Sequence, residues 1–171
     1  IRTKVNIFKI SDGPDYREAV KKGDFEKIKK LAYFKSWKKN VIPIVGRMQI
    51  AKILSQHCDI QVKDEKGETW INKCALGTSS APFDENSTKL GAEVFRKNVS
   101  SASYSGNELR ILSHYLPEDT EGNFREEGVF INGTNEADSG FAFSLINLTA
   151  AEGDKTSSEA LLIERVITFG A

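Results

Sequence analysis

Hydrophobic and polar residues alternate in short segments throughout the last hundred residues of this 171-residue chain. Near the C-terminus, for example, the large Phe141, Phe143 and Leu145 alternate with the smaller Ala142 and Ser144, in a segment that is apolar on both faces, as in a central strand. Successive side chains of a β-strand point to opposite faces, so a period of two predicts strands rather than helices. The predicted strands cover residues 70–75, 93–104, 108–115, 124–131, 141–148 and 160–169.

Loops rich in Ser, Thr, Asn, Gly and Pro separate these segments, and no helical pattern intervenes between them. Short strands that follow one another without a crossover helix pair antiparallel, in a sandwich or a barrel. We therefore expect a mainly β fold, an antiparallel β-sandwich of about six to eight strands, preceded by an α-helical N-terminal segment.

The N-terminal third has a helical pattern. Over residues 16–34 the apolar positions fall near one stripe of a helix, and lysines fill the rest. Asp15 is expected to cap this helix, and a glycine before Asp24 is expected to divide it, with Asp24 capping the second half. A further helix is predicted over residues 45–55, and a polar linker over residues 59–68.

Charge is distributed unevenly, although the formal net charge of the chain is zero. Residues 1–40 contain twelve Lys or Arg and five Asp or Glu, so they carry +7, and residues 41–171 therefore carry −7. Opposite blocks of this kind can pair head-to-tail between subunits, or the basic end can dock on an acidic partner. A solvated, lysine-rich helix face explains the same composition equally well.

The sequence disfavours two classes of protein, membrane proteins and metal-binding proteins. No apolar run approaches the roughly 20 residues of a membrane span, and the first residues lack the apolar stretch of a signal peptide. Cys58 and Cys74 are expected to be reduced thiols. With His57 and His114 they could in principle bind zinc, but the spacing contains no C-x-x-C or H-x-x-x-H pair. We expect neither a metal nor a cofactor.

A candidate structural clamp lies between residues 77 and 96. Gly77 follows a predicted strand, where glycine can adopt a positive φ, and the Thr78 hydroxyl can bond to the loop backbone. Glu93 and Arg96 are three residues apart. A carboxylate and a guanidinium at that spacing can hold a long loop through a bidentate ion pair or through backbone carbonyls.

A catalytic interpretation of Glu93 requires a second carboxylate or base fixed opposite it. Glu126 or Glu127 could supply that group, but nothing in the sequence places them there. The chain also lacks the G-x-S-x-G nucleophile elbow, the G-x-x-x-x-G-K-[ST] phosphate loop and the G-x-G-x-x-G dinucleotide motif. We therefore expect a structural role for Glu93, no catalytic residues, and no enzymatic activity.

Four motifs occur in order over roughly residues 40–170: NVIPIVGRMQIAKIL (40–54), ALGT (75–78) followed by Leu90, Glu93 and Arg96, REEGVF (125–130), and KTSSEALLIERVITF (155–169). This order resembles a family of phage structural proteins, with Glu127 where that family usually has alanine. The resemblance implies a virion protein of the tail, baseplate or tail-fibre attachment, made in the host bacterial cytoplasm. It implies other virion proteins as partners; a capsid or neck decoration protein is a less favoured role.

Residues 1–39 match no part of that pattern. We therefore divide the chain into a basic helical assembly segment (1–39) and a β-sandwich virion module with a leading short helix (40–171). The assembly segment ends in a basic and aromatic cluster, namely Tyr33, Phe34, Trp37, Lys38 and Lys39. Such a cluster can bind nucleic acid by stacking and phosphate contacts, or it can anchor a helix end on a neighbouring subunit. We prefer the neighbouring subunit, in a homo-oligomeric ring or trimer, because the rest of the chain is acidic.

A host glycan or receptor-binding module is the alternative function. Loops 77–89 and 117–124 would then face the ligand, and Phe83 would supply an aromatic contact. A glycan depolymerase is the enzymatic alternative, and it would need two carboxylates at catalytic separation.

Overall fold

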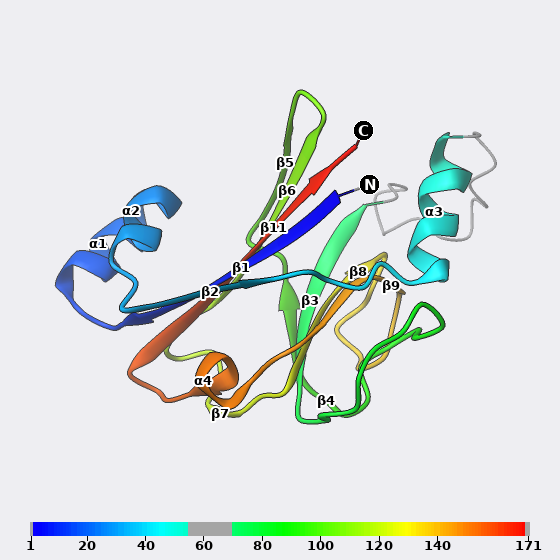
Figure 1. Ribbon diagram of the computed structural model, residues 1–171. Coiled ribbons are helices and arrows are strands. Elements are labelled where there is room, and N and C mark those ends of the chain that lie inside the picture. The colour runs from blue at the N-terminus through cyan, green and yellow to red at the C-terminus, as the bar shows by residue number, and fades with distance from the viewer. Residues whose placement is uncertain (1, 55–69, 170–171) are drawn as a thin grey trace. The chain divides into compact units, whose positions relative to one another are not determined.

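The computed structural model describes residues 2–54 and 70–169, and these residues form a mainly β protein (Figure 1). All strand pairs in the described ranges are antiparallel. The predicted mainly β, antiparallel fold class is therefore confirmed. The linker predicted over residues 59–68 lies outside the described residues, as do His57 and Cys58.

The chain forms two compact units, and neither is a continuous stretch of sequence. The first unit contains residues 1–39, 100–123 and 149–171, and the second contains residues 40–99 and 124–148. The predicted boundary after residue 39 does separate the units at that point. The prediction of a separate N-terminal segment is nevertheless wrong, because residues 1–39 fold together with two later stretches of the chain.

The first unit is built on a five-stranded sheet in the order β2-β1-β11-β6-β5. Its strands are β1 (Arg2–Ser11), β2 (Phe34–Lys38), β5 (Ser101–Ser105), β6 (Glu108–Tyr115) and β11 (Glu159–Thr168). β1 pairs with β11 from Arg2↔Thr168 to Ser11↔Glu159, so the first and last strands of the chain lie side by side (Figure 1). A short helix, α4 (Ala150–Gly153), and a pair of two-residue strands, β7 (Gly122–Asn123) and β10 (Asp154–Lys155), complete this unit.

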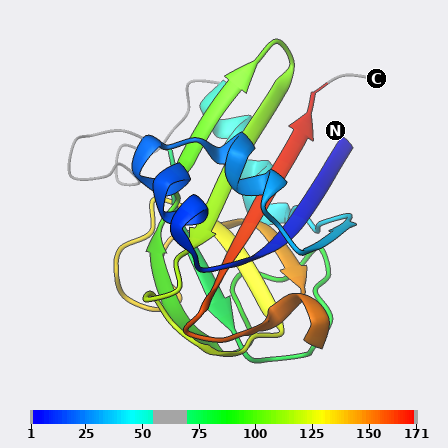
Figure 2. The same ribbon diagram turned by 90° about the vertical axis from the view of Figure 1, so that its left-hand side faces the viewer.

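Two helices, α1 (Pro14–Lys22) and α2 (Phe25–Lys30), cover one face of the five-stranded sheet (Figure 2). As predicted, Asp24 caps the second of them, since the Lys27 amide donates to Asp24 Oδ1 at 2.9 Å. The predicted cap at Asp15 is wrong: Gly13 occupies the cap position, because the proline that follows it is suited to the first helical turn. The helices and the sheet enclose a core of Ile10, Tyr16, Ala19, Ile28, Leu112, Ala160 and Leu162.

The second unit is built on a four-stranded sheet in the order β4-β3-β8-β9. Its strands are β3 (Ile71–Gly77), β4 (Glu93–Asn98), β8 (Glu126–Ile131) and β9 (Phe141–Asn147). The predicted helix near residues 45–55 is present as α3 (Ile44–Leu54), which packs against β9. Gly46 permits this packing, because a Cβ atom there would lie 2.8 Å from the carbonyl oxygen of Ala142.

The predicted strands are present, one of them divided in two, and the strands that were not predicted are β1, β2 and the two-residue β7 and β10. The strand predicted over residues 93–104 is two strands, β4 and β5, which belong to different units. The predicted α-helical start of the chain is wrong over β1 and β2, which are strands. In β1 the fully buried Val5 and Ile7 alternate with less buried neighbours, which is a strand pattern, but one of its two pairing partners, β11, lies at the far end of the chain.

Candidate functional site

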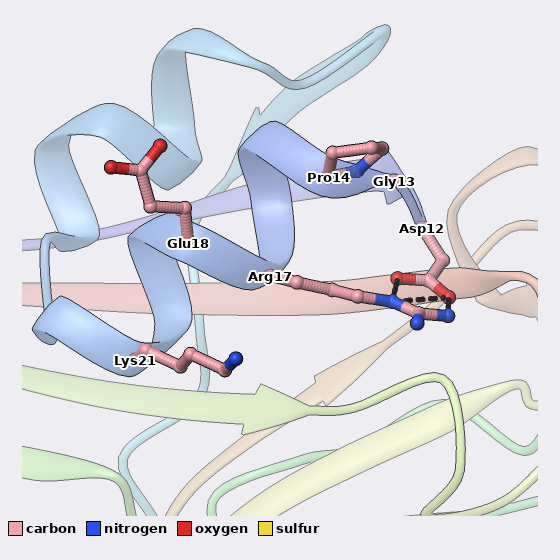
Figure 3. A pocket seen from close by; sticks show the side chains of 6 residues that line it. All are labelled: Asp12, Gly13, Pro14, Arg17, Glu18 and Lys21. Carbon is pink, nitrogen blue, oxygen red and sulfur yellow. Dashed lines mark hydrogen bonds and ion pairs between the residues drawn. The ribbon is translucent and has the colours of Figure 1, made fainter.

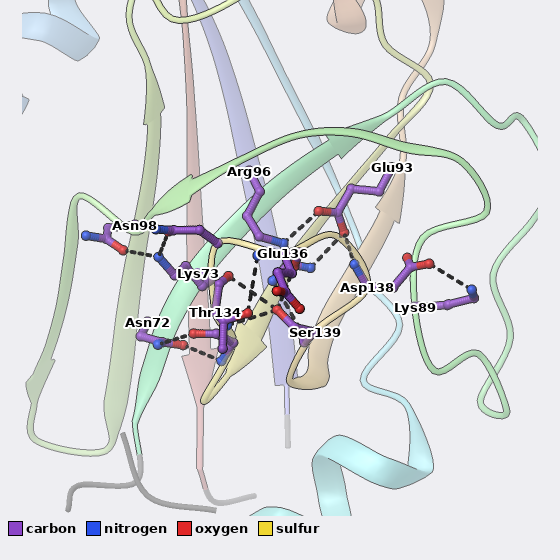
Figure 4. A network of polar contacts seen from close by, with 12 residues as sticks. Asn72, Lys73, Lys89, Glu93, Arg96, Asn98, Thr134, Glu136, Asp138 and Ser139 are labelled. Atoms are coloured by element: carbon purple, nitrogen blue, oxygen red, sulfur yellow. Dashed lines mark hydrogen bonds and ion pairs between the residues drawn. The ribbon is translucent and has the colours of Figure 1, made fainter. Parts of the chain in front are cut away.

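Glu93 and Arg96, predicted as part of a clamp, form a buried bidentate ion pair on β4. Arg96 Nε donates to Glu93 Oε1 at 2.6 Å and Arg96 Nη2 donates to Glu93 Oε2 at 2.7 Å, and each side chain is 3% exposed. Arg96 also donates to the Ser139 carbonyl at 3.1 Å, and the Asp138 amide donates to Glu93 at 3.2 Å. The pair therefore holds the loop between β8 and β9 against β4 (Figure 4).

Lys73 extends this polar network from the neighbouring strand β3 (Figure 4). Its Nζ donates to Asn98 Oδ1 at 2.7 Å and to Asn135 Oδ1 at 2.6 Å, and the residue is buried. Burial, followed by the positive charge of Arg96, lowers the pKa of Lys73. The network is thus a second attachment of the same loop to the sheet.

Glu126 has a structural role that was not predicted from the sequence. It begins β8, is fully buried, and accepts hydrogen bonds from the amides of Ser79, Gly91 and Ala92 at 3.3, 2.8 and 2.7 Å. A carboxylate that accepts several backbone N–H bonds in a buried site is held in one orientation. Glu126 therefore closes the loop between β3 and β4, and its carboxylate is committed to that task.

Gly77 and Thr78, which were predicted as clamp residues, lie at the start of the loop that Glu126 closes. The Thr78 amide donates to the Ala92 carbonyl at 3.0 Å, which joins the two ends of the loop. The expectation that Gly77 has a positive φ is wrong. Glycine is required there for space instead, because a Cβ atom would collide with the Glu126 carboxylate and with the Ala92 carbonyl.

Replacement of Glu126 tests whether this closure stabilises the second unit. We expect Glu126→Gln to lower the free energy of unfolding by about 3 kcal/mol, because an amide cannot accept all of these charge-assisted bonds. Urea denaturation of both proteins measures the difference. Glu85→Gln, which changes an exposed carboxylate of the same loop, should cost less than about 0.5 kcal/mol. Equal effects of the two substitutions would contradict the assigned role of Glu126.

An exposed basic and aromatic surface lies along β2, an edge strand of the five-stranded sheet. We call Lys4, Lys35, Trp37 and Lys39 the β2 surface; all four are exposed, and Trp37 is 65% exposed. The Lys4 ammonium lies 5.7 Å from the centroid of the Trp37 ring, within the range of a cation–π contact. The β2 surface therefore combines an aromatic side chain with positive charge on a strand whose outer edge pairs with no other described strand.

The remaining residues of the predicted assembly cluster are held within their own unit. Lys38 Nζ donates to Glu152 Oε2 at 2.5 Å and the Ser36 hydroxyl donates to Glu152 Oε1 at 2.7 Å, so β2 is attached to α4. Tyr33 donates to Glu159, and Phe34 is half-buried. Of the predicted assembly residues, Trp37 and Lys39 are thus the ones that contribute to the β2 surface.

A shallow basic hollow adjoins the β2 surface on the same unit. It has a volume of about 370 Å³, and its lining includes Arg2, Lys4, Asn6, Arg110 and Glu164. Glu164 is buried and binds Lys29 at 2.6 Å and Asn6 at 3.1 Å, so its negative charge is taken up inside the fold. Arg110 is paired with Glu108 of the same lining at 3.0 Å, so the exposed Arg2 and Lys4 are the residues that extend the positive charge beyond β2.

Protonation of Glu152 should loosen β2. Burial of Glu152 opposes its ionisation, but the hydrogen bonds from Lys38, Thr149 and Ser36 outweigh it, and they lower its pKa below the usual 4.5. A carboxyl group whose pKa is lower in the folded state than in the unfolded state stabilises the fold at pH values above its unfolded-state pKa. This stabilisation is lost as the pH falls through the folded-state pKa. Unfolding free energy should therefore fall more steeply below about pH 4.5 in the wild type than in Glu152→Gln.

The measurement is urea denaturation at a series of pH values between about 7 and 3. Glutamine keeps the helix-capping geometry of Glu152 while removing its charge. Glu121→Gln, at an exposed carboxylate of the same unit, serves as the control and should retain the wild-type pH profile. Parallel profiles of Glu152→Gln and the wild type would contradict the attachment.

The hollow beside the first helix offers little to a catalytic mechanism. It has a volume of about 590 Å³ and is lined by residues around the start of α1, among them Asp12, Arg17 and Lys21 (Figure 3). Asp12 and Arg17 bind each other, with Arg17 Nε 2.9 Å from Asp12 Oδ1. In the described ranges, no three His, Cys, Asp or Glu side chains are grouped so as to hold a metal ion. No helix in those ranges is long and apolar enough to cross a bilayer.

The aromatic residue expected to contact a glycan is not displayed on the surface. Phe83 is partly buried and packs against the core cluster that contains Ala75, Leu90 and Phe130. Its amide also donates to Asn147 Oδ1 at 3.2 Å, which fixes this part of the loop. The loop that carries Phe83 thus contributes this ring to the core of the second unit.

No family model, curated protein or solved structure matches this chain. Its function is therefore inferred from its own residues and their geometry.

Proposed function

We propose that the protein is a structural component of a phage virion, in the tail, the baseplate or a fibre attachment, and that it binds other virion proteins through the β2 surface. The virion placement is supported by the four ordered motifs between residues 40 and 170. The mode of action is supported by one observation above all, the exposure of Trp37 on a basic edge strand.

Trp37 has the properties of an interface anchor. Tryptophan is among the residues that contribute most to binding when a partner removes them from water. Its neighbours Lys4, Lys35 and Lys39 would favour a partner surface that is acidic. Residues 41–171 of this chain carry a net charge of −7, so a second copy in a ring or trimer satisfies that condition, as does another acidic virion protein.

Assembly is favoured over catalysis because the carboxylates considered for catalysis are engaged. Glu93 is paired with Arg96, Glu126 accepts three backbone amides, and Glu127 is fully buried. A general acid or base must be able to contact its substrate. Receptor binding is less favoured because the aromatic ring expected to contact a glycan, Phe83, packs against the core.

Substitution of Trp37 tests the assembly role. In phage particles produced with Trp37→Ser in place of the wild-type chain, we expect at least about a tenfold lower content of this chain, because the anchor is lost. Quantitative mass spectrometry of purified particles measures that content. Urea denaturation should show little change in stability, since the Trp37 side chain is 65% exposed.

Trp70→Ser is the matched control, because Trp70 is also an exposed tryptophan, at 47%, but lies just before β3 in the second unit. This variant should enter particles at the wild-type level. Absence of the wild-type chain from purified particles would overturn the virion placement. Equal incorporation of Trp37→Ser and wild type would overturn the role of the β2 surface.

A further inference from the structure

The strand at the opposite edge of the five-stranded sheet, β5, differs from the other edge strands. An edge strand presents unpaired N–H and C=O groups, and proteins protect such edges with charged side chains, prolines, bulges or a covering segment. β2 has Lys35 and Lys38, and β4 has Arg96 and Lys97 together with a register shift in its pairing with β3. The outer side of β9 is bridged by Val41.

Within the described residues, β5 has none of these protections. Its sequence is Ser-Ala-Ser-Tyr-Ser, without a charge or a proline, and its pairing with β6 is regular from Ser101↔Leu112 to Ser105↔Glu108. No described strand lies beyond it in the sheet. Four of its five residues are exposed, and Tyr104 is 86% exposed. Figure 1 shows β5 and β6 as a hairpin with β5 on the outside.

We propose that β5 is a self-pairing edge, on which the β5 strand of a second copy of this chain docks antiparallel about a two-fold axis through Ser103. An isologous contact of this kind requires a strand that complements itself. The sequence of β5 does so, because its first, third and fifth residues are all serine. In this register three positions pair serine with serine and two pair alanine with tyrosine. Backbone hydrogen bonds along these five positions would then add a strand to each sheet.

Side-chain size supports the two-fold register. With Ser103 opposite its own copy, Ala102 lies opposite Tyr104 of the second copy, and Tyr104 lies opposite its Ala102. Each exposed tyrosine ring then covers the smallest side chain of the facing strand, and directly opposed side chains are the unit of contact between strands. The serines on the other face pair with serines, whose hydroxyls can donate to and accept from one another.

Charge favours a second copy at β5 over a second copy at β2. Antiparallel pairing of two β5 strands brings no like charges together, because the strand carries none. The same arrangement at β2 would bring Lys35 and Lys38 near the lysines of the other copy, which is unfavourable. The two-fold contact by itself makes a dimer, and it is separate from the ring or trimer expected through the β2 surface.

A charged residue on the proposed axis is the first test. At a protein concentration of about 100 µM, native mass spectrometry and sedimentation of the purified wild-type chain should show a dimer. Ser103→Lys places two lysines directly opposite each other and should raise the dimer dissociation constant about fivefold or more. Ser157→Lys, the same substitution at an exposed loop serine of the same unit, should leave the dimer unchanged. A wild-type chain that stays monomeric at this concentration would overturn the proposal, as would a dimer indifferent to Ser103→Lys.

Disulfide trapping tests the register. In a Cys58→Ser background, where the remaining Cys74 is buried, Ser103→Cys should crosslink to its own copy under mild oxidation. Ser101→Cys should crosslink poorly, because residue 101 faces residue 105 of the second copy. Efficient crosslinking of Ser101→Cys alone would contradict the two-fold axis at Ser103. Both tests use the purified chain, so their failure is distinguishable from a failure of the β2 surface in particles.

Discussion

The antiparallel ladder between β1 and β11 is the interaction on which the first unit depends. It joins ten residues at the start of the chain to ten at its end, and it places both strands in the middle of the sheet. Closing a loop of this length costs about 4 kcal/mol of chain entropy, a cost that grows only logarithmically with length. Side chains such as Ile7 and Ile163 are fully buried in the paired strands, and each such side chain contributes about 2 kcal/mol. The ladder also positions β2, which pairs with β1 on one side and with no described strand on the other.

Buried carboxylates connect separate segments of the chain in both units. Glu126 and Glu93 fix loops of the second unit to its sheet, and Glu164 joins β11 to Lys29 of α2 and to Asn6 of β1. Charge burial is costly unless the charge is paired or hydrogen-bonded. Glu93 and Glu164 have cationic partners, and Glu126 has three backbone amide donors. A carboxylate that binds three backbone amides or an arginine is thus held in place by the protein itself.

Local signals in the sequence predicted more of the structure than long-range ones, although the local predictions of a cap at Asp15 and a positive φ at Gly77 were wrong. Asp24 was identified as a cap and Glu93 with Arg96 as a pair because each interaction spans three residues. β1 was missed although its alternation was visible, because a short apolar run gains its strand character from a partner at the far end of the chain. The structural role of Glu126 was missed for the same reason, since its donors lie 34 to 47 residues away. The four ordered motifs could not reveal that the chain alternates between two units.

The contrast between β2 and β5 follows from the chemistry of sheet edges. Both strands are five residues long and lie at opposite ends of one sheet, so the backbone offers the same unpaired groups on each. Lysines on β2 oppose the addition of a like-charged strand but attract an acidic surface, and Trp37 supplies the apolar contact for it. The uncharged β5 can select a partner strand only by the fit of its side chains. Because its sequence is symmetric about Ser103, a second copy of β5 provides the best fit. In the proposed assembly the two edges therefore select different partners, so self-pairing at β5 and attachment at β2 can occur together on one sheet.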